Sequence, residues 1–153
     1  MQIITVTATK KIILGIDPGS VVAGWGIIET NGFVSKHLAH GHIRPRKDNE
    51  RYRRIGEICS ALSDVIVNWN PCETALESTY VGVNPRSALA LGEARGGAII
   101  AITSNSLRMT SYDPTTIKMI ATGDSRASKA KVQQMVAAIL KLESPLQPDA
   151  ADA

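Results

Sequence analysis

The sequence contains few of the features that mark secreted or membrane proteins. Its only cysteines, Cys59 and Cys72, form no Cys-x-x-Cys motif, which argues against a disulfide framework and favours a reducing compartment. We find no signal peptide, no apolar run long enough to span a bilayer, no internal repeat and no low-complexity linker. At 153 residues, of which 44% are hydrophobic, the chain can form one domain with a core. We therefore expect a cytoplasmic protein without a membrane partner.

Charge is nearly balanced overall but unevenly distributed. The chain carries 17 Lys and Arg against 14 Asp and Glu, a net charge of +3. Residues 36–54 hold seven cations and two anions, and residues 108–141 hold six cations and two anions. Two basic segments on a nearly neutral chain favour a surface that binds a polyanion, although two solvated helix faces would give the same pattern.

An apolar segment that ends in one carboxylate lies near the N-terminus. Residues 12–16 include three isoleucines and are typical of a strand buried on both faces. Asp17 ends this run, and Pro18-Gly19 then suits a tight turn. A buried carboxylate is costly unless it is paired or binds a cation. Asp17 is therefore either an ordinary turn residue or a metal ligand.

The pattern of the remaining chain predicts an α/β fold. Residues 21–30 and 33–44 are rich in strand-forming residues and flank the hairpin signal Asn31-Gly32, so the first three strands should form an antiparallel meander. Apolar spacing and the Pro, Gly and Asn breaks predict the other elements. Helices are expected over residues 48–69, 85–101, 115–121 and 129–142, and strands over residues 73–77 and 109–112.

Three further carboxylates lie near the ends of predicted elements. Glu77 ends a strand as Asp17 does, and ligands gather beyond strand ends in layered α/β proteins, although an exposed strand-end glutamate would look the same. Asp149 and Asp152 would share one face of a helix that begins at Pro148. Carboxylate oxygens suit magnesium or manganese. Beside basic segments, such a cluster is what metal-dependent phosphodiester cleavage requires.

Three histidines, His37, His40 and His42, lie on the strand predicted over residues 33–44. Strand alternation would place His40 and His42 on one face and His37 on the other. A zinc site is conceivable, but an exposed strand explains these residues better.

The first turn of the helix predicted over residues 48–69 contains Arg51, Arg53 and Arg54. Cations at this end oppose the helix dipole, so helix stability does not explain them and a binding role is favoured. Three glycines in the helix that begins at Pro85 are also costly. We expect another backbone to pack closely where they lie, at Gly92, Gly96 and Gly97.

Several motifs together resemble the RuvC family of Holliday junction endonucleases, over about residues 11–153. They are Gly-Ile-Asp-Pro-Gly-Ser at 15–20, Leu-Glu at 76–77, Ser-Ala-Leu at 87–89, Leu-Gly-Glu-Ala-Arg-Gly at 91–96, Lys129, Val-Gln at 132–133 and Asp-Ala-Ala-Asp-Ala at 149–153. The resemblance implies a ribonuclease-H-like fold, with a five-stranded mixed sheet and helices on both faces. It also implies a bacterial homodimer that binds a four-way DNA junction, nicks two strands symmetrically in recombination and repair, and works with the RuvA–RuvB branch-migration complex.

The resemblance also implies residue roles. The four family carboxylates fall on Asp17, Glu77, Asp149 and Asp152, which would hold two Mg²⁺ ions, with Mn²⁺ as a possible substitute. The family's base-stacking aromatic falls on Tyr80, and its two lysines near the phosphates fall on Lys118 and Lys129, where solvated helix surfaces are the alternative. We further expect Arg51, Arg54 and Arg86 to contact DNA.

Residues 1–10 read as an N-terminal leader, and residues 11–153 as a single nuclease domain that stops within its last helix. If Asp149 and Asp152 stand on so short a helix, we expect weak metal binding and impaired cleavage, with junction binding less affected. A DNA-binding module without catalysis is therefore one alternative. An actin- or Hsp70-like ATPase is another, although those proteins need two such domains and a chain more than twice this length.

Overall fold

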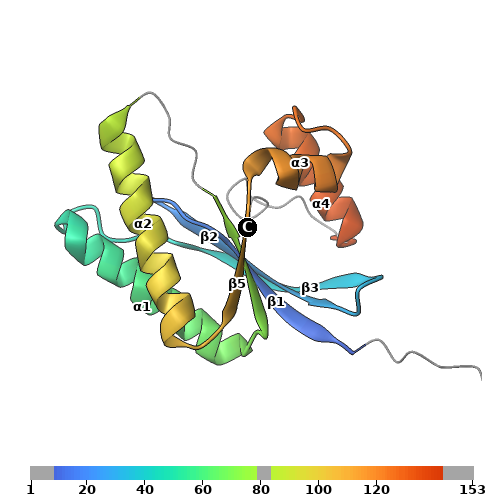
Figure 1. Cartoon of the computed structure of the whole chain (residues 1–153), viewed down its shortest axis with the longest axis horizontal. Coiled ribbons are helices and arrows are strands. Elements are labelled where there is room, and N and C mark those ends of the chain that lie inside the picture. The colour runs from blue at the N-terminus through green and yellow to red at the C-terminus, as the bar shows by residue number, and fades with distance from the viewer. Residues whose placement is uncertain (1–8, 79–83, 143–153) are drawn as a thin grey trace, which may run out of the picture.

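The computed structural model describes residues 9–78 and 84–142, which form five strands and four helices (Figure 1). The elements are β1 (Lys11–Asp17), β2 (Ala23–Thr30), β3 (Ser35–Ile43), α1 (Arg51–Trp69), β4 (Glu73–Glu77), α2 (Pro85–Ser104), β5 (Arg108–Tyr112), α3 (Pro114–Thr122) and α4 (Lys129–Ile139). None of the helices in these two ranges is both long and apolar enough to cross a bilayer.

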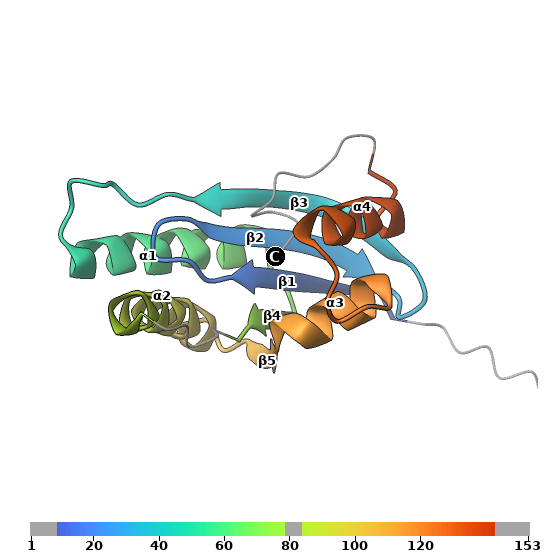
Figure 2. The same cartoon turned by 90° about the horizontal axis from the view of Figure 1, so that it is seen from above.

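The strands form one mixed sheet in the order β3-β2-β1-β4-β5. The first three strands are the predicted antiparallel meander, and β4 and β5 join parallel to β1. Helices α1 and α2 cover one face, and α3 and α4 lie on the other (Figures 1 and 2). The expected five-stranded mixed sheet with helices on both faces is confirmed, and β1 lies at its centre.

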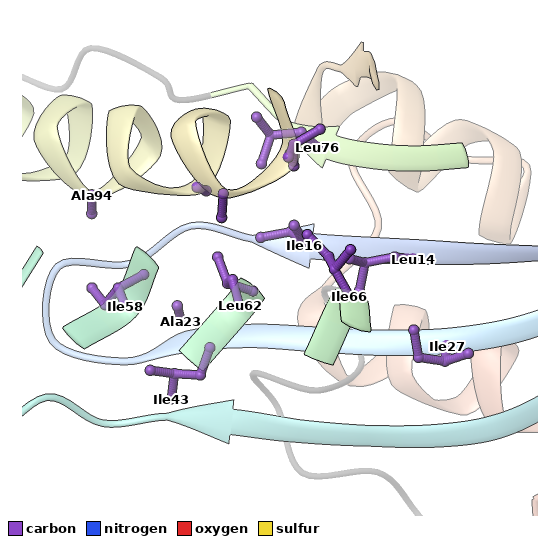
Figure 3. Packing of buried hydrophobic residues seen from close by; sticks show 13 residues of the cluster. Leu14, Ile16, Ala23, Ile27, Ile43, Ile58, Leu62, Ile66, Leu76 and Ala94 are labelled. Carbon is purple, nitrogen blue, oxygen red and sulfur yellow. The ribbon is translucent and has the colours of Figure 1, made fainter. Parts of the chain in front are cut away.

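The hydrophobic core lies between the sheet and the pair α1 and α2 (Figure 3). Alternate residues of β1, Leu14 and Ile16, point into it and are almost fully buried, together with Leu76 of β4. Helix α1 supplies large side chains such as Leu62, whereas α2 supplies mostly small ones. The buried residues of α2 are Ala94, Gly97, Ala98, Ala101 and Ile102.

The glycines of α2 have different surroundings. A Cβ at Gly97 would lie 3.0 Å from Cγ2 and 3.4 Å from the carbonyl oxygen of Ile55 in α1, so the expected close backbone is present there. At Gly92 and Gly96, no atom of the described chain would lie within 4 Å of an added Cβ. Within one copy, the expectation of a close backbone is therefore wrong at these two positions.

Several element ends differ from the prediction. Helix α1 begins at Arg51 instead of residue 48, because the Glu57 carboxylate accepts hydrogen bonds from Arg46 N (2.9 Å) and from the Asn49 side chain and so holds the preceding turn. The hairpin loop has four residues, because the Asn31 side chain accepts hydrogen bonds from the backbone N–H groups of Phe33 and Val34. Helix α4 ends at Ile139 instead of residue 142.

The histidines on β3 are arranged differently from the prediction. A β-bulge pairs Ile27 with Ala39 but Ile28 with His37, so that the regular alternation is interrupted between them. As a result His37 joins the face of His40, and His37 Nε2 lies 2.8 Å from His40 Nδ1. The prediction that His37 points away from His40 is therefore wrong.

Candidate active site

The predicted carboxylates Asp17 and Glu77 end two neighbouring parallel strands. Ile16 of β1 pairs with Leu76 of β4, so the residues that follow them lie side by side. Adjacent strands are about 4.8 Å apart, and residues at matching positions project from the same face of the sheet. Both carboxylates are half-buried. The parallel register therefore brings together two acidic residues that are 60 positions apart in the sequence.

These two carboxylates line a cavity of about 230 Å³, here called the carboxylate cavity. Its other walls come from α3 and α4, on the face of the sheet opposite the core. Lys118 of α3 and Lys129 of α4 both line it. The fold thus brings together two acidic and two basic residues that the sequence placed on four different elements. The cavity is lined by Asp17, Glu77, Pro114, Ile117, Lys118, Lys129 and Val132.

The turn between α3 and α4 determines where the two lysines lie. Gly123 ends α3 in the left-handed conformation, with a φ of 74° that favours glycine. Ser128 begins α4, and its hydroxyl accepts a hydrogen bond from Lys131 N at 3.3 Å. Asp113 precedes α3, but its side chain makes no capping hydrogen bond there.

The donor set of the carboxylate cavity suits a hard divalent cation. Asp17 and Glu77 offer oxygen ligands of the kind that magnesium and manganese prefer. Within residues 9–78 and 84–142, no group of three or more His, Cys, Asp or Glu side chains is placed to hold a metal ion. Two carboxylates are therefore the contribution of the described chain. Asp149 and Asp152, and the proposed stacking residue Tyr80, lie outside the described residues.

The predicted DNA-binding arginines line a second cavity, of about 370 Å³, here called the arginine cavity. Arg51 and Arg54 come from the first turn of α1, and Arg86 comes from the first turn of α2. Sequence reasoning identified these residues by charge but missed that they share one cavity, and it missed Ser20 and Ser87, which also line it. No local sequence signal relates the start of α1 to the start of α2.

Comparisons with known proteins show the family of this chain. The family model for crossover junction endodeoxyribonuclease RuvC matches residues 13–153. Proteins of that name from Histophilus somni and Shewanella woodyi are 42% and 44% identical, covering 94% and 93% of this chain and 75% and 82% of their own lengths.

The structure of Thermus thermophilus RuvC in complex with a Holliday junction substrate matches with a TM-score of 0.87 at 26% identity, over 94% of this chain and 88% of that one. This match supports the ribonuclease-H-like fold expected from the sequence. Because the family model covers nearly the whole chain and the sequence relatives exceed 40% identity over most of both lengths, the chain belongs to the RuvC family of crossover junction endodeoxyribonucleases.

Proposed function

We propose that this chain resolves four-way DNA junctions in the bacterial cytoplasm by paired, symmetric nicks, as part of recombination and repair. The observation that carries the proposal is the carboxylate cavity, where Asp17 and Glu77 meet Lys118 and Lys129. The acidic pair suits a divalent cation, and the basic pair suits a phosphate. Hydrolysis of a phosphodiester needs both in one place.

Asp17 and Glu77 would hold the metal, together with Asp149 and Asp152 by family resemblance. The chemistry that bound metal supplies is activation of a water and stabilisation of the leaving oxygen. We propose Mg²⁺, two ions per site, as the cation used. Strands hold these two ligands more rigidly than loops would, which favours a defined position for the ions.

Lys118 and Lys129 would draw the scissile phosphate toward the carboxylates. Two carboxylates alone would repel a DNA strand, and two ammonium groups in the same cavity offset that charge. Lys118 is half-buried, so salt screens its field less than that of an exposed lysine. Tyr80 is proposed to stack on a base near the crossover. The RuvA–RuvB complex is proposed as the partner of this chain.

A homodimer is proposed to pair through the outer face of α2. Leu89, Gly92, Gly96 and Ile100 follow one another at spacings of three and four residues, so they share the face opposite the core. Leu89 and Ile100 are more than half exposed, and the two glycines have open space beside them in the described chain. Small residues flanked by apolar ones allow two helices to approach closely. Two active sites related by the dimer axis would account for paired nicks.

The direct test is Asp17→Asn, compared with the matched control Asp64→Asn. Asp64 is an exposed residue of α1 and does not line the carboxylate cavity, so its replacement removes the same charge elsewhere. With Mg²⁺ present, Asp17→Asn should lower the nicking rate of a four-way junction at least about a hundredfold, since loss of even an indirect metal contact costs 10–100-fold. Junction affinity should be unchanged or higher, because a negative charge has been removed.

Gel-shift binding and single-turnover nicking would be followed on the same samples while Mg²⁺ is titrated. Normal nicking by Asp17→Asn would reject its role as a metal ligand. Tight junction binding without nicking by the unmodified chain at any Mg²⁺ concentration would favour the alternative of a binding module.

A further inference from the structure

The arginine cavity lies where α1 and α2 begin. Both helices start at the same end of the molecule and run in the same direction (Figure 2). Three arginines line this cavity, and among residues 9–78 and 84–142 only Arg51 pairs with a carboxylate, that of Glu93 in α2. Arg86 is exposed, and its side chain makes no hydrogen bond or ion pair with any residue that the structure describes. The cavity therefore keeps a positive charge that the described chain does not neutralise.

Arg54 is fixed in position and still has donor capacity. Its Nη2 donates to the carbonyl oxygen of Ser20 at 2.7 Å, which anchors the guanidinium to the turn that follows β1. Its Nε is buried and has no hydrogen-bond partner within the described residues. A buried donor without a partner costs free energy, so Arg54 is held in this position against a penalty.

The first turns of the helices around the cavity contain arginines where acidic residues would be favourable. Neither helix has an acidic residue in its first turn. Helix α1 has no side-chain cap at Glu50, whereas in α2 the Asn84 side chain accepts a hydrogen bond from Arg86 N at 3.0 Å. The positive ends of two helix dipoles thus lie beside three arginines, of which Glu93 offsets one, an arrangement that favours a bound anion.

The arginine cavity is close to the carboxylate cavity along the chain. Ser20 lines the first and Asp17 lines the second, and their Cα atoms are separated by at most about 11 Å, the reach of three extended residues. A DNA strand rises about 3.4 Å per nucleotide along the duplex axis, so these two points at the end of β1 lie within a few nucleotides of each other. The two cavities therefore approach each other at the end of β1, one from each face of the sheet.

We propose that the arginine cavity binds one non-scissile phosphate of the DNA strand whose scissile phosphate lies at Asp17 and Glu77. This inference rests on the proposed function and adds a second fixed point for the strand. A phosphate held by Arg51, Arg54 and Arg86 sets which phosphodiester reaches the carboxylates. The arginines act here as positioning residues, because they do not touch the reacting atoms.

The test uses junctions in which a single phosphate near the cleavage point is replaced by an uncharged methylphosphonate. Dissociation constants are measured without divalent cations, for each of five positions on either side of the scissile phosphate. For the unmodified chain, one non-scissile position should weaken binding about tenfold, the effect of losing one charged hydrogen-bond contact. In Arg86→Gln, the same methylphosphonate should weaken junction binding by less than about twofold. The slope of log K against the logarithm of salt concentration should be smaller by about 1.

Arg53→Gln is the matched control. Arg53 neighbours Arg54 in α1 but does not line the cavity, and its Nε donates to the hydroxyl of Tyr52 at 3.1 Å. This variant should keep the full penalty at the sensitive position. Arg51→Gln provides a second cavity variant, and thermal unfolding verifies that each variant is folded.

The proposal would be overturned if a methylphosphonate weakened binding equally in Arg86→Gln and in the unmodified chain at every non-scissile position. It would also be overturned if the two proteins differed only at the scissile phosphate. Nicking in Mg²⁺ is measured separately on unmodified junctions. If the effect of Arg86→Gln depended on one non-scissile phosphate but the chain did not nick, the arginine cavity would be supported and the endonuclease function rejected. If the chain nicked but no non-scissile phosphate depended on Arg86, only the phosphate-binding role of the arginine cavity would be rejected.

Discussion

Alanine at two adjacent glycines of α2 should stabilise the fold at Gly96 but not at Gly97. The substitution is the same at both positions, in the same helix, so helix propensity contributes equally. Gly97 faces α1, where Ile55 is close, whereas Gly96 faces away from the core with open space in the described chain. The difference between the two variants therefore isolates the helix–helix contact.

The magnitudes follow from the geometry. Replacing Gly by Ala inside a helix stabilises it by about 0.8–1.0 kcal/mol. At Gly96 nothing opposes this gain, so the free energy of unfolding of one copy should rise by about 1 kcal/mol. At Gly97 the new methyl would lie 3.0 Å from Ile55 Cγ2, closer than an ordinary van der Waals contact. Overpacking of this kind costs about 1–3 kcal/mol, so Gly97→Ala should be neutral or destabilising by up to about 2 kcal/mol.

The assay is urea unfolding followed by circular dichroism, at a protein concentration low enough for single copies to dominate. Sedimentation equilibrium at higher concentration then measures dimerisation. Because the proposed dimer uses the face of Gly96, its replacement should weaken dimerisation even as it stabilises the single copy. Gly97 is buried inside one copy, so any effect on dimerisation should follow its effect on the fold.

Two results would refute this reasoning. If Gly97→Ala stabilised the single copy as much as Gly96→Ala, the contact with Ile55 would not restrict the position. If Gly96→Ala left the dimer dissociation constant unchanged, the outer face of α2 would not be the dimer interface. The first result concerns packing within one copy, and the second concerns only the proposed homodimer.

Two further predictions concern the fold. Leu62 is fully buried between α1 and the sheet, so Leu62→Ala should lower the free energy of unfolding by about 3–5 kcal/mol in urea titration, and a loss below about 1 kcal/mol would contradict this packing. Burial, and next the neighbouring His40, lower the pKa of His37 from 6.5, so the unfolded chain binds more protons and stability should fall as pH drops below about 6.5. In His37→Gln the fall in stability should be smaller. If the urea midpoint of the variant fell as much between pH 7 and pH 5 as that of the unmodified chain, this prediction would be contradicted.

Local patterns were sufficient to predict most elements. The apolar run before Asp17, the strand before Glu77 and the Asn84-Pro85 helix start all appear where they were expected, because each depends on neighbouring residues. The facing of His37 could not be predicted, since the bulge opposite Ile27 and Ile28 depends on how two strands pair.

The site was predictable only in part for a similar reason. Residue type and resemblance indicated the carboxylates and lysines, but their assembly into one cavity requires the parallel pairing of β1 with β4 and the placement of α3 and α4. The arginine cavity requires that α1 and α2 begin side by side, which no periodicity within either helix specifies. Its discovery needed tertiary structure, although charge had already indicated its residues.

The position of Asp17 on β1 explains how one strand can support both the core and the site. Leu14 and Ile16 face α1 and α2, and alternation turns Asp17 to the opposite face, where the lysines lie. A shift of one residue in pairing with β4 would direct the carboxylate into the apolar core, where an unpaired charge is costly. The buried leucine and isoleucine therefore fix the register, and the register in turn places Asp17 beside Glu77. Substitutions that loosen this core should disturb the carboxylate cavity even though they contact none of its residues.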